Sequence, residues 1–248
     1  HAAAEYTPPS VSIAVGIQDG STALGSILQV AMDPPNAPLL GVHNGANPLV
    51  VVLPEFDVRK IGQSNPLASG SNTITVTIQT NVNLAQADSS VVTITGLTGA
   101  PDRASLALTS VSNSAADFFT DGASQGKGVL SSETLTLTVH TGQTVAGGTQ
   151  YVFSFVITNP SAAQDASAVS IAASGTASFP ISRGVMTTDN PNRYVTDGGK
   201  PLKVIVPSFS ASAIGQSTPV AGATVTISVT LTANSDFPTG SNVTIAGL

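Results

Sequence analysis

The chain lacks cysteine and tryptophan and has few charged residues. With no Cys, a disulfide framework and a thiolate metal site are both excluded. Charged residues make up 9% of the sequence, against roughly 25% in an average soluble domain, so Ser, Thr, Asn, Gln and Gly must supply the polar surface. A net charge of −6 with only 8 Lys plus Arg argues against a nucleic-acid partner.

Long hydrophobic runs are missing as well. No apolar stretch approaches the roughly 18 residues that cross a bilayer, so no membrane span is predicted. Hydrophobic residues nevertheless account for 41% of the 248 positions, which is enough for a real core. Few charges, abundant Thr and Ser, and 16 Pro favour an extracellular or cell-surface location.

Apolar and polar residues alternate with a period of two along most of the chain, which predicts strands with one buried face. The alternating runs are Asn72–Ile78, Ser90–Leu97, Ser105–Val111, Thr134–His140 and Tyr151–Thr158. In the first run, the aliphatic side chains of Ile74, Val76 and Ile78 are expected in the core, with the intervening threonines outside. No amphipathic helix is predicted, and many short strands separated by turns indicate an all-β antiparallel β-sandwich.

One long stretch of sequence occurs twice. Pro48–Asn81 and Pro201–Asn234 are identical at sixteen of 34 positions, with a constant offset of 153 residues. After a two-residue contraction, "VTITGL" at Val92–Leu97 corresponds to "VTIAGL" at Val243–Leu248. Self-similarity at a fixed period is typical of an array of units, and a period near 150 residues is long enough for each unit to be a domain.

A third similarity links "VSIAV" at Val11–Val15 to "VSIAA" at Val169–Ala173. The chain is therefore predicted to hold about one and a half copies of a repeat of roughly 155 residues. The predicted parts are an N-terminal donor strand with a Pro-rich linker (1–44), a complete β-sandwich domain (45–174), a second linker (175–200) and the first strands of an incomplete second copy (201–248).

Four segments carry a resemblance to a known class of proteins: "PLVVVLPEF", "SNTITVTIQTN", "TLTLTVHTGQTVAGGTQYVFSFVITNP" and "VSIAASG". Their pattern resembles the immunoglobulin-like β-sandwich repeats of microbial and algal surface fibres and adhesins. The resemblance covers most of the chain, although the Cys and Trp of antibody domains are absent. It implies a structural, adhesive or filament-forming role.

The sequence predicts no catalytic residue and no cofactor. The three histidines are His1, His43 and His140, and no G-x-S-x-G motif accompanies them. We interpret His43 and His140 as ordinary loop or strand-end residues, and an enzyme is the least favoured class.

No metal site is predicted either, although two neighbouring acidic residues are conceivable calcium ligands. Asp117 and Asp121 are close together in "ADFFTDG", and Ca²⁺ prefers several hard oxygen ligands. The spacing of a calcium-binding loop is absent, so a turn-forming role is favoured. Asp33 and Asp189 lie one in each predicted linker.

Two surface features remain as candidates. Phe118 and Phe119 form an apolar pair in a predicted loop, either as a contact between subunits or as part of their own core. Asn242 begins the sole Asn-Val-Thr sequon and is a candidate N-glycosylation site, which makes glycans a potential partner.

The favoured function is that of a structural subunit of an extracellular filament. The predicted assembly strand comprises Val11, Ser12, Ile13, Ala14 and Val15. We expect it to complete the open sheet of another copy by strand addition, giving a head-to-tail homopolymer. Two alternatives stay open: an adhesin-type module that binds a glycan or receptor through its loops, and a longer covalent array of which Leu248 is not the natural end.

Overall fold

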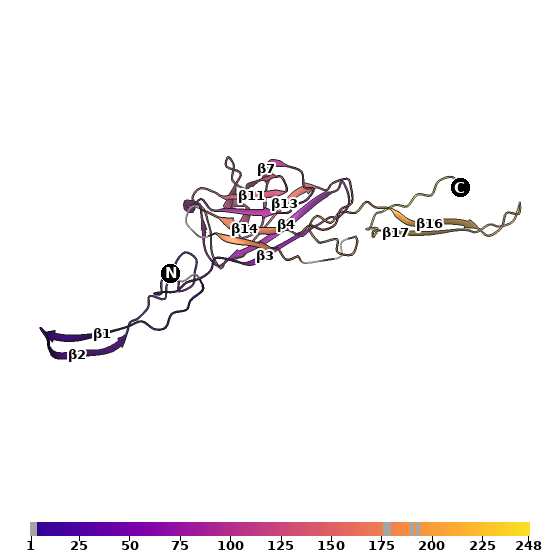
Figure 1. Cartoon of the computed structure of the whole chain (residues 1–248). Coiled ribbons are helices and arrows are strands. Elements are labelled where there is room, and N and C mark those ends of the chain that lie inside the picture. Colours follow the sequence, from indigo (N-terminus) through magenta and orange to yellow (C-terminus); the bar gives the residue numbers. More distant parts are fainter. Residues whose placement is uncertain (1–3, 176–179, 189–190, 192–193) are drawn as a thin grey trace.

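The computed structural model describes residues 4–175, 180–188, 191 and 194–248. Its central part contains a seven-stranded sheet and a four-stranded sheet, and a two-stranded hairpin projects from each of two opposite ends (Figure 1). Every ladder between the named strands is antiparallel. The only helical elements among the described residues are two short 3₁₀ turns, η1 (Gln86–Asp88) and η2 (Ala115–Phe118). The predicted all-β class with antiparallel sheets is thus confirmed.

The seven-stranded sheet has the order β15-β14-β6-β11-β10-β7, and β9 also pairs with β11. Its strands are β15 (Ile181–Val185), β14 (Ser170–Ser174), β6 (Val91–Thr95), β11 (Thr134–Val139), β10 (Lys127–Ser131), β7 (Arg103–Ala107) and β9 (Phe119–Thr120). The four-stranded sheet has the order β3-β4-β13-β8. Its strands are β3 (Phe56–Gln63), β4 (Ser71–Thr80), β13 (Tyr151–Thr158) and β8 (Thr109–Ser112).

Three small ladders complete the structure. A two-residue pairing joins β5 (Leu84–Ala85) to β12 (Thr144–Val145). The N-terminal hairpin consists of β1 (Ser12–Asp19) and β2 (Thr22–Ala31), and the C-terminal hairpin consists of β16 (Phe209–Gln216) and β17 (Ile227–Ala233). We call the body between these hairpins, built on β3 to β15, the central unit.

Alternation in the sequence accounts for the core of the central unit. Ile74, Val76 and Ile78 on β4 are buried as predicted, whereas the threonines between them are exposed or half-buried. Inner-face residues of both larger sheets join one cluster, because successive side chains of a strand point to opposite faces. Across the β4–β13 ladder, Phe153 lies opposite Val76 and Phe155 lies opposite Ile74.

The two predicted linkers need correction, because each contains a strand. β2 lies in the first, and β15 lies in the second, where it pairs with β14. Ile181, Met186 and Leu202 are buried members of the core cluster, so the ordered body extends beyond Ser174. Both strands alternate poorly in sequence, and the burial of Ile181, Met186 and Leu202 depends on neighbours that are distant in sequence.

The prediction that Val243–Leu248 follows the path of β6 is also wrong. The segment forms no strand, whereas β6 is hydrogen-bonded between β11 and β14. Since backbone groups of a strand need partners on neighbouring strands, the same sequence pattern stays unpaired where such partners are absent.

Candidate assembly site

The C-terminal hairpin has the same residue pairing as β3 and β4 of the central unit. Ile61 lies opposite Val76 in one hairpin, and Ile214 lies opposite Val229 in the other. Each ladder has its register shift at the same place, directly after the phenylalanine that begins the first strand. We call residues that occupy the same place in two such ladders counterparts.

Side-chain hydrogen bonds at the base of these two hairpins match as well. The amide oxygen of Asn81 accepts from the backbone N–H of Glu55 at 2.9 Å, and its amide nitrogen donates to the carbonyl of Leu53 at 2.7 Å. Asn234 accepts from Ser208 at 2.8 Å and donates to Val206 at 2.9 Å. All of these residues are 153 positions from their counterparts.

The N-terminal hairpin matches β14 and β15 in the same way. Ser12, Ile13 and Val15 pair with Ala31, Val30 and Ile27, whereas Ser170, Ile171 and Ala173 pair with Val185, Gly184 and Ile181. Both ladders have a register shift between the second and third of these pairs. Beyond each ladder a methionine N–H, of Met32 or Met186, donates to the valine that precedes the first strand, at 2.8 Å in both cases.

The N-terminal hairpin and the matching β14–β15 hairpin are each followed by a junction, and the two junctions have similar backbone conformations. Leu40 and Tyr194 have positive φ angles of 52° and 59°, and Leu49 and Leu202 have positive φ angles of 65° and 59°. The carbonyl of Leu40 accepts from Asn83 N–H at 2.8 Å, and the carbonyl of Tyr194 accepts from Asp236 N–H at 2.7 Å. A non-glycine residue at positive φ is uncommon, so two matching pairs indicate a shared local structure.

A buried glutamine fastens the second junction to the central unit. The Gln63 amide nitrogen donates to the carbonyls of Gly198 at 2.9 Å and Lys203 at 2.8 Å. Its amide oxygen accepts from the N–H of Leu202 at 2.7 Å and from the side chain of Asn72 at 3.0 Å. The side chain thus reaches both backbone and side-chain partners, and the junction is held against the unit instead of forming a free linker.

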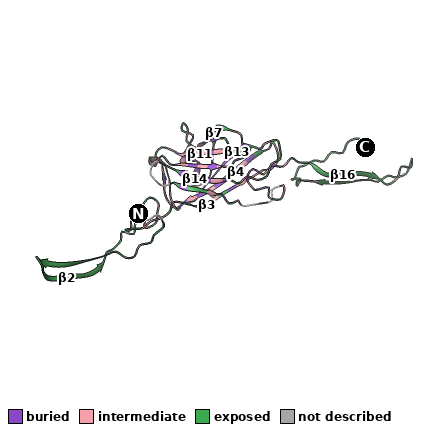
Figure 2. Ribbon diagram, viewed as in Figure 1, coloured by how far each residue is buried: buried purple, intermediate pink, exposed green. Residues whose placement is uncertain are grey.

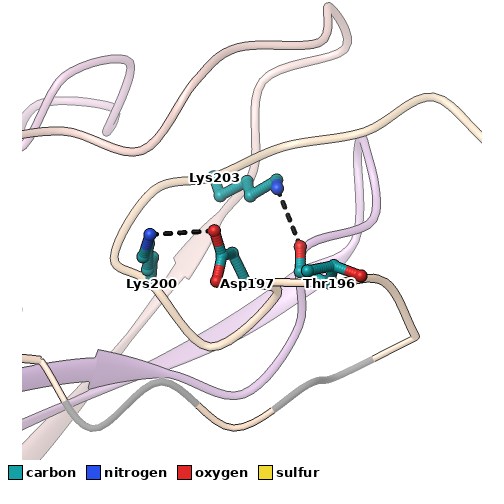
Figure 3. Close-up of polar contacts among 4 residues, drawn as sticks. All are labelled: Thr196, Asp197, Lys200 and Lys203. Carbon is teal, nitrogen blue, oxygen red and sulfur yellow. Dashed lines mark hydrogen bonds and ion pairs between the residues drawn. The ribbon is translucent and has the colours of Figure 1, made fainter.

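The same junction carries two contacts at its surface (Figure 3). The Lys200 ammonium lies 2.8 Å from the Asp197 carboxylate, and the Lys203 ammonium donates to the Thr196 carbonyl at 2.8 Å. Half-exposed ion pairs of this kind contribute about 0–1 kcal/mol. The buried Gln63 contacts therefore hold the junction more strongly than these two surface contacts do.

Burial separates the terminal hairpins from the central unit (Figure 2). Ile13 is 55% exposed whereas its counterpart Ile171 is fully buried, and Leu49 is 60% exposed whereas Leu202 is fully buried. The exposed apolar residues with buried counterparts are Val11, Ile13, Val15, Ile27, Met32 and Leu49 on the N-terminal side, and Phe209, Ile214, Ile227, Val229 and Leu231 on the C-terminal side. Exposed apolar residues in such number make the two terminal hairpins candidates for an interaction site.

The predicted assembly strand lies in the N-terminal hairpin. Val11 precedes β1, and Ser12, Ile13, Ala14 and Val15 are exposed residues within it. The prediction of a lone strand is wrong, because β1 pairs with β2 along one edge. The sequence missed β2 since its residues do not alternate. No other described strand pairs with β1, so its second edge is open.

The two candidate phenylalanines pack against other side chains of the central unit. Phe119 is buried and packs edge to face with Phe153 at a centroid distance of 5.7 Å. Phe118 is partly buried against the core, 4.9 Å from the ring of Tyr151. The structure favours the second of the two interpretations, core packing, because T-shaped aromatic pairs of this kind stabilise an interior.

The acidic residues that are conceivable calcium ligands show no ligand arrangement. The Asp121 carboxylate accepts hydrogen bonds from the Ser105 hydroxyl and from the N–H groups of Ala123 and Ser124, which lowers the pKa of Asp121 to about 2. Within the described ranges, no three His, Asp or Glu side chains are grouped closely enough to hold a metal ion. Asp189 lies outside the described residues.

The remaining candidates are surface residues or are not described. Asn242 is exposed, in keeping with access for a glycan, and His43 is exposed while His140 is half-buried. His1 lies outside the described residues. No helix in the described part of the chain has the length and apolar character of a membrane span. A comparison with protein-family models gives no match to the chain, and a comparison with curated proteins gives none either.

Proposed function

We propose that the protein is a structural subunit of an extracellular or cell-surface filament that assembles head to tail through β-strand complementation. The burial contrast carries the proposal, because apolar residues exposed in the two terminal hairpins have counterparts that are buried in the central unit. Two different surfaces that fit each other make a contact that propagates instead of closing. A filament is the expected product.

The proposal includes a tandem repeat of immunoglobulin-like β-sandwich units. The matching registers of two pairs of hairpins and the two junctions of equal conformation support the repeat. One core shared by residues of both larger antiparallel sheets supports the sandwich. An array of such units joined by fastened junctions would transmit tension along its length, which suits a mechanical role.

Surface composition supports the proposed location. Only 9% of the residues are charged, and Thr and Ser supply much of the outer faces of the strands. Such a surface offers many hydroxyl groups and one sequon, at Asn242, so we include glycan attachment in the proposal. Mass spectrometry of the native material tests this part, since a glycosylated chain exceeds 24.7 kDa.

Electron microscopy and sedimentation of the purified protein over a range of concentrations test the filament. We expect polymers of regular width, and we expect deletion of His1–Gly16 to abolish them by removing most of β1. Polymers formed by the truncated chain would rule out strand donation by this segment. A monomer at every concentration would contradict the filament and favour the alternative of a glycan- or receptor-binding module.

A further inference from the structure

We propose that the N-terminal hairpin of one copy docks on the C-terminal segment of a second copy in one fixed register, with β1 beside Asn242–Leu248 and Leu49 inserted beside Gln216. The inference rests on the proposed head-to-tail assembly. It adds to that assembly the partner surface, the residue pairing and the side chain that locks the contact.

The central unit supplies the template for the register. β14 pairs antiparallel with β6, and Ile171 lies opposite Ile94 in this ladder. Ile13 is the counterpart of Ile171, and Ile245 occupies the place of Ile94 in the repeated "VTI" sequence. The same pairing between two copies therefore puts Ile13 of one copy opposite Ile245 of the other.

Both edges needed for this ladder are open. β1 pairs only with β2 among the described strands, and Asn242–Leu248 forms no strand. An open edge presents unpaired N–H and C=O groups to an incoming strand. A slip of one residue would turn the apolar side chains of β1 away from the partner, so burial selects a single register.

Leu49 is the second part of the contact. In the central unit its counterpart Leu202 is fully buried, and the Leu202 N–H donates to the Gln63 side chain at 2.7 Å. Gln216 is the counterpart of Gln63 in the C-terminal hairpin and is exposed. The docked Leu49 would meet Gln216 as Leu202 meets Gln63.

The conformation of the junction is already set before docking. Leu49 has a φ angle of 65° and Leu202 has a φ angle of 59°, so the exposed leucine has the backbone conformation of the buried one. A binding segment that needs little rearrangement loses less conformational entropy on association. The side chain of Leu49 is thus presented in the form that the partner surface accommodates.

Engineered cysteines test the register, since the natural chain contains none. Residues directly opposite in an antiparallel ladder have Cα atoms about 4.5–5.5 Å apart, within the range that a disulfide bridges. We would mix full-length Ile13→Cys with full-length Ile245→Cys, oxidise gently, and measure the disulfide-linked dimer by non-reducing electrophoresis. We choose covalent trapping because the contact between two copies would be only part of a central unit. The two hairpins and Asn242–Leu248 supply counterparts of only β3, β4, β6, β14 and β15.

The matched control is Ile13→Cys mixed with Thr244→Cys. Residue 244 is adjacent to Ile245 but faces the opposite side of a strand. We expect at least tenfold more mixed dimer from the 13–245 mixture than from the 13–244 mixture. Equal yields, or dimers formed mainly by Ile13→Cys with itself, would overturn the inference.

Leu49→Asp in the Ile13→Cys chain tests whether Leu49 stabilises the contact. We expect at least a tenfold lower yield of the 13–245 dimer, whereas Leu53→Asp leaves the yield unchanged. Leu53 is a suitable control because it is exposed although it adjoins the central unit. An unchanged yield with Leu49→Asp would show that Leu49 does not lock the contact.

The failure of this inference and that of the filament are distinguishable. Polymers seen by electron microscopy, together with equal yields from the two cysteine mixtures, would leave the filament standing and overturn the docking register. A 13–245 dimer obtained from a protein that never polymerises would support the docking register and contradict the filament. Thermal unfolding of each variant checks that the central unit remains folded.

Discussion

Replacement of Gln63 by alanine should strongly destabilise the central unit. The side chain is buried and makes four hydrogen bonds, to Gly198, Lys203, Leu202 and Asn72. Three of these are buried, and the one to Lys203 is part-buried. Truncation therefore leaves the Gly198 carbonyl and the Leu202 N–H without this partner, and it removes one of the two acceptors of the Asn72 amide.

The magnitude follows from the cost of such groups. A buried donor or acceptor without a partner costs about 1–3 kcal/mol, and water entering the truncated site offsets part of the sum. We expect a net loss of about 3–5 kcal/mol, at the upper end of the effects of single substitutions. Since small domains unfold with about 5–15 kcal/mol, the variant should be folded but markedly less stable.

The chain offers a matched control in Gln216→Ala. Gln216 has the same neighbours in sequence and the same place in its ladder as Gln63, but it is exposed in the single chain. Truncation of an exposed residue changes the unfolding free energy by no more than about 0.5 kcal/mol. The pair of variants separates the effect of the buried network from the effect of the sequence context.

Urea unfolding at low protein concentration is the appropriate assay, because association would add stability of its own. With a slope of about 2 kcal/mol/M, the Gln63→Ala midpoint should fall by roughly 1.5–2.5 M. Fluorescence of the buried tyrosine at position 151 reports on the central unit. Equal shifts for the two variants would refute the assignment of Gln63 as the residue that fastens the junction.

Two further expectations rest on the described contacts. Leu202→Ala should lower the unfolding free energy of the dispersed chain by about 2–5 kcal/mol through loss of buried volume, whereas Leu49→Ala should change it by less than about 0.5 kcal/mol; equal effects in urea unfolding would contradict the burial contrast. The pKa of Asp121 should be about 2 in a carboxyl-carbon NMR titration and should rise toward 3.8 in Ser105→Ala, which removes the hydrogen bond that lowers it most. Because folding depresses this pKa, the stability from Asp121 is present above pH 3.8 and is lost as the pH falls through about 2; a Ser105→Ala chain with an unchanged pKa would refute this cause.

Sequence patterns predict the strands that alternate and miss those that do not. β4 was predictable because buried aliphatic residues alternate with threonine along all of Asn72–Ile78. β15 reads "ISRGV", with only Ile181 buried, so no periodic signal marks it. Its place at the edge of the seven-stranded sheet comes from pairing with β14, which is tertiary information.

The candidate assembly site was predictable in outline and not in detail. Identity between two segments marked Gln63 and Gln216 as equivalent positions. It did not show that three of the four partners of Gln63 lie 135–140 residues further along the chain. Nor does a leucine signal a left-handed backbone, since rules based on residue type expect Gly or Asn there.

The β1–β2 hairpin and the matching β14–β15 hairpin differ in length, and this difference shows which part of the hairpin is constrained. Ala31 lies 19 positions after its partner Ser12, whereas Val185 lies only 15 positions after Ser170. The two ladders share their pairs up to Val15 and Ala173 and differ beyond them.

That shared part coincides with the segment of β14 that pairs with β6, Ser170–Ser174. A turn that faces solvent tolerates insertion, whereas a slip within a ladder that is paired on both edges would reverse its buried face. The N-terminal hairpin thus retains its register over Ser12–Val15, residues that would meet a β6-like strand, and varies beyond them. We expect this pattern if the N-terminal hairpin pairs with another strand, as proposed above.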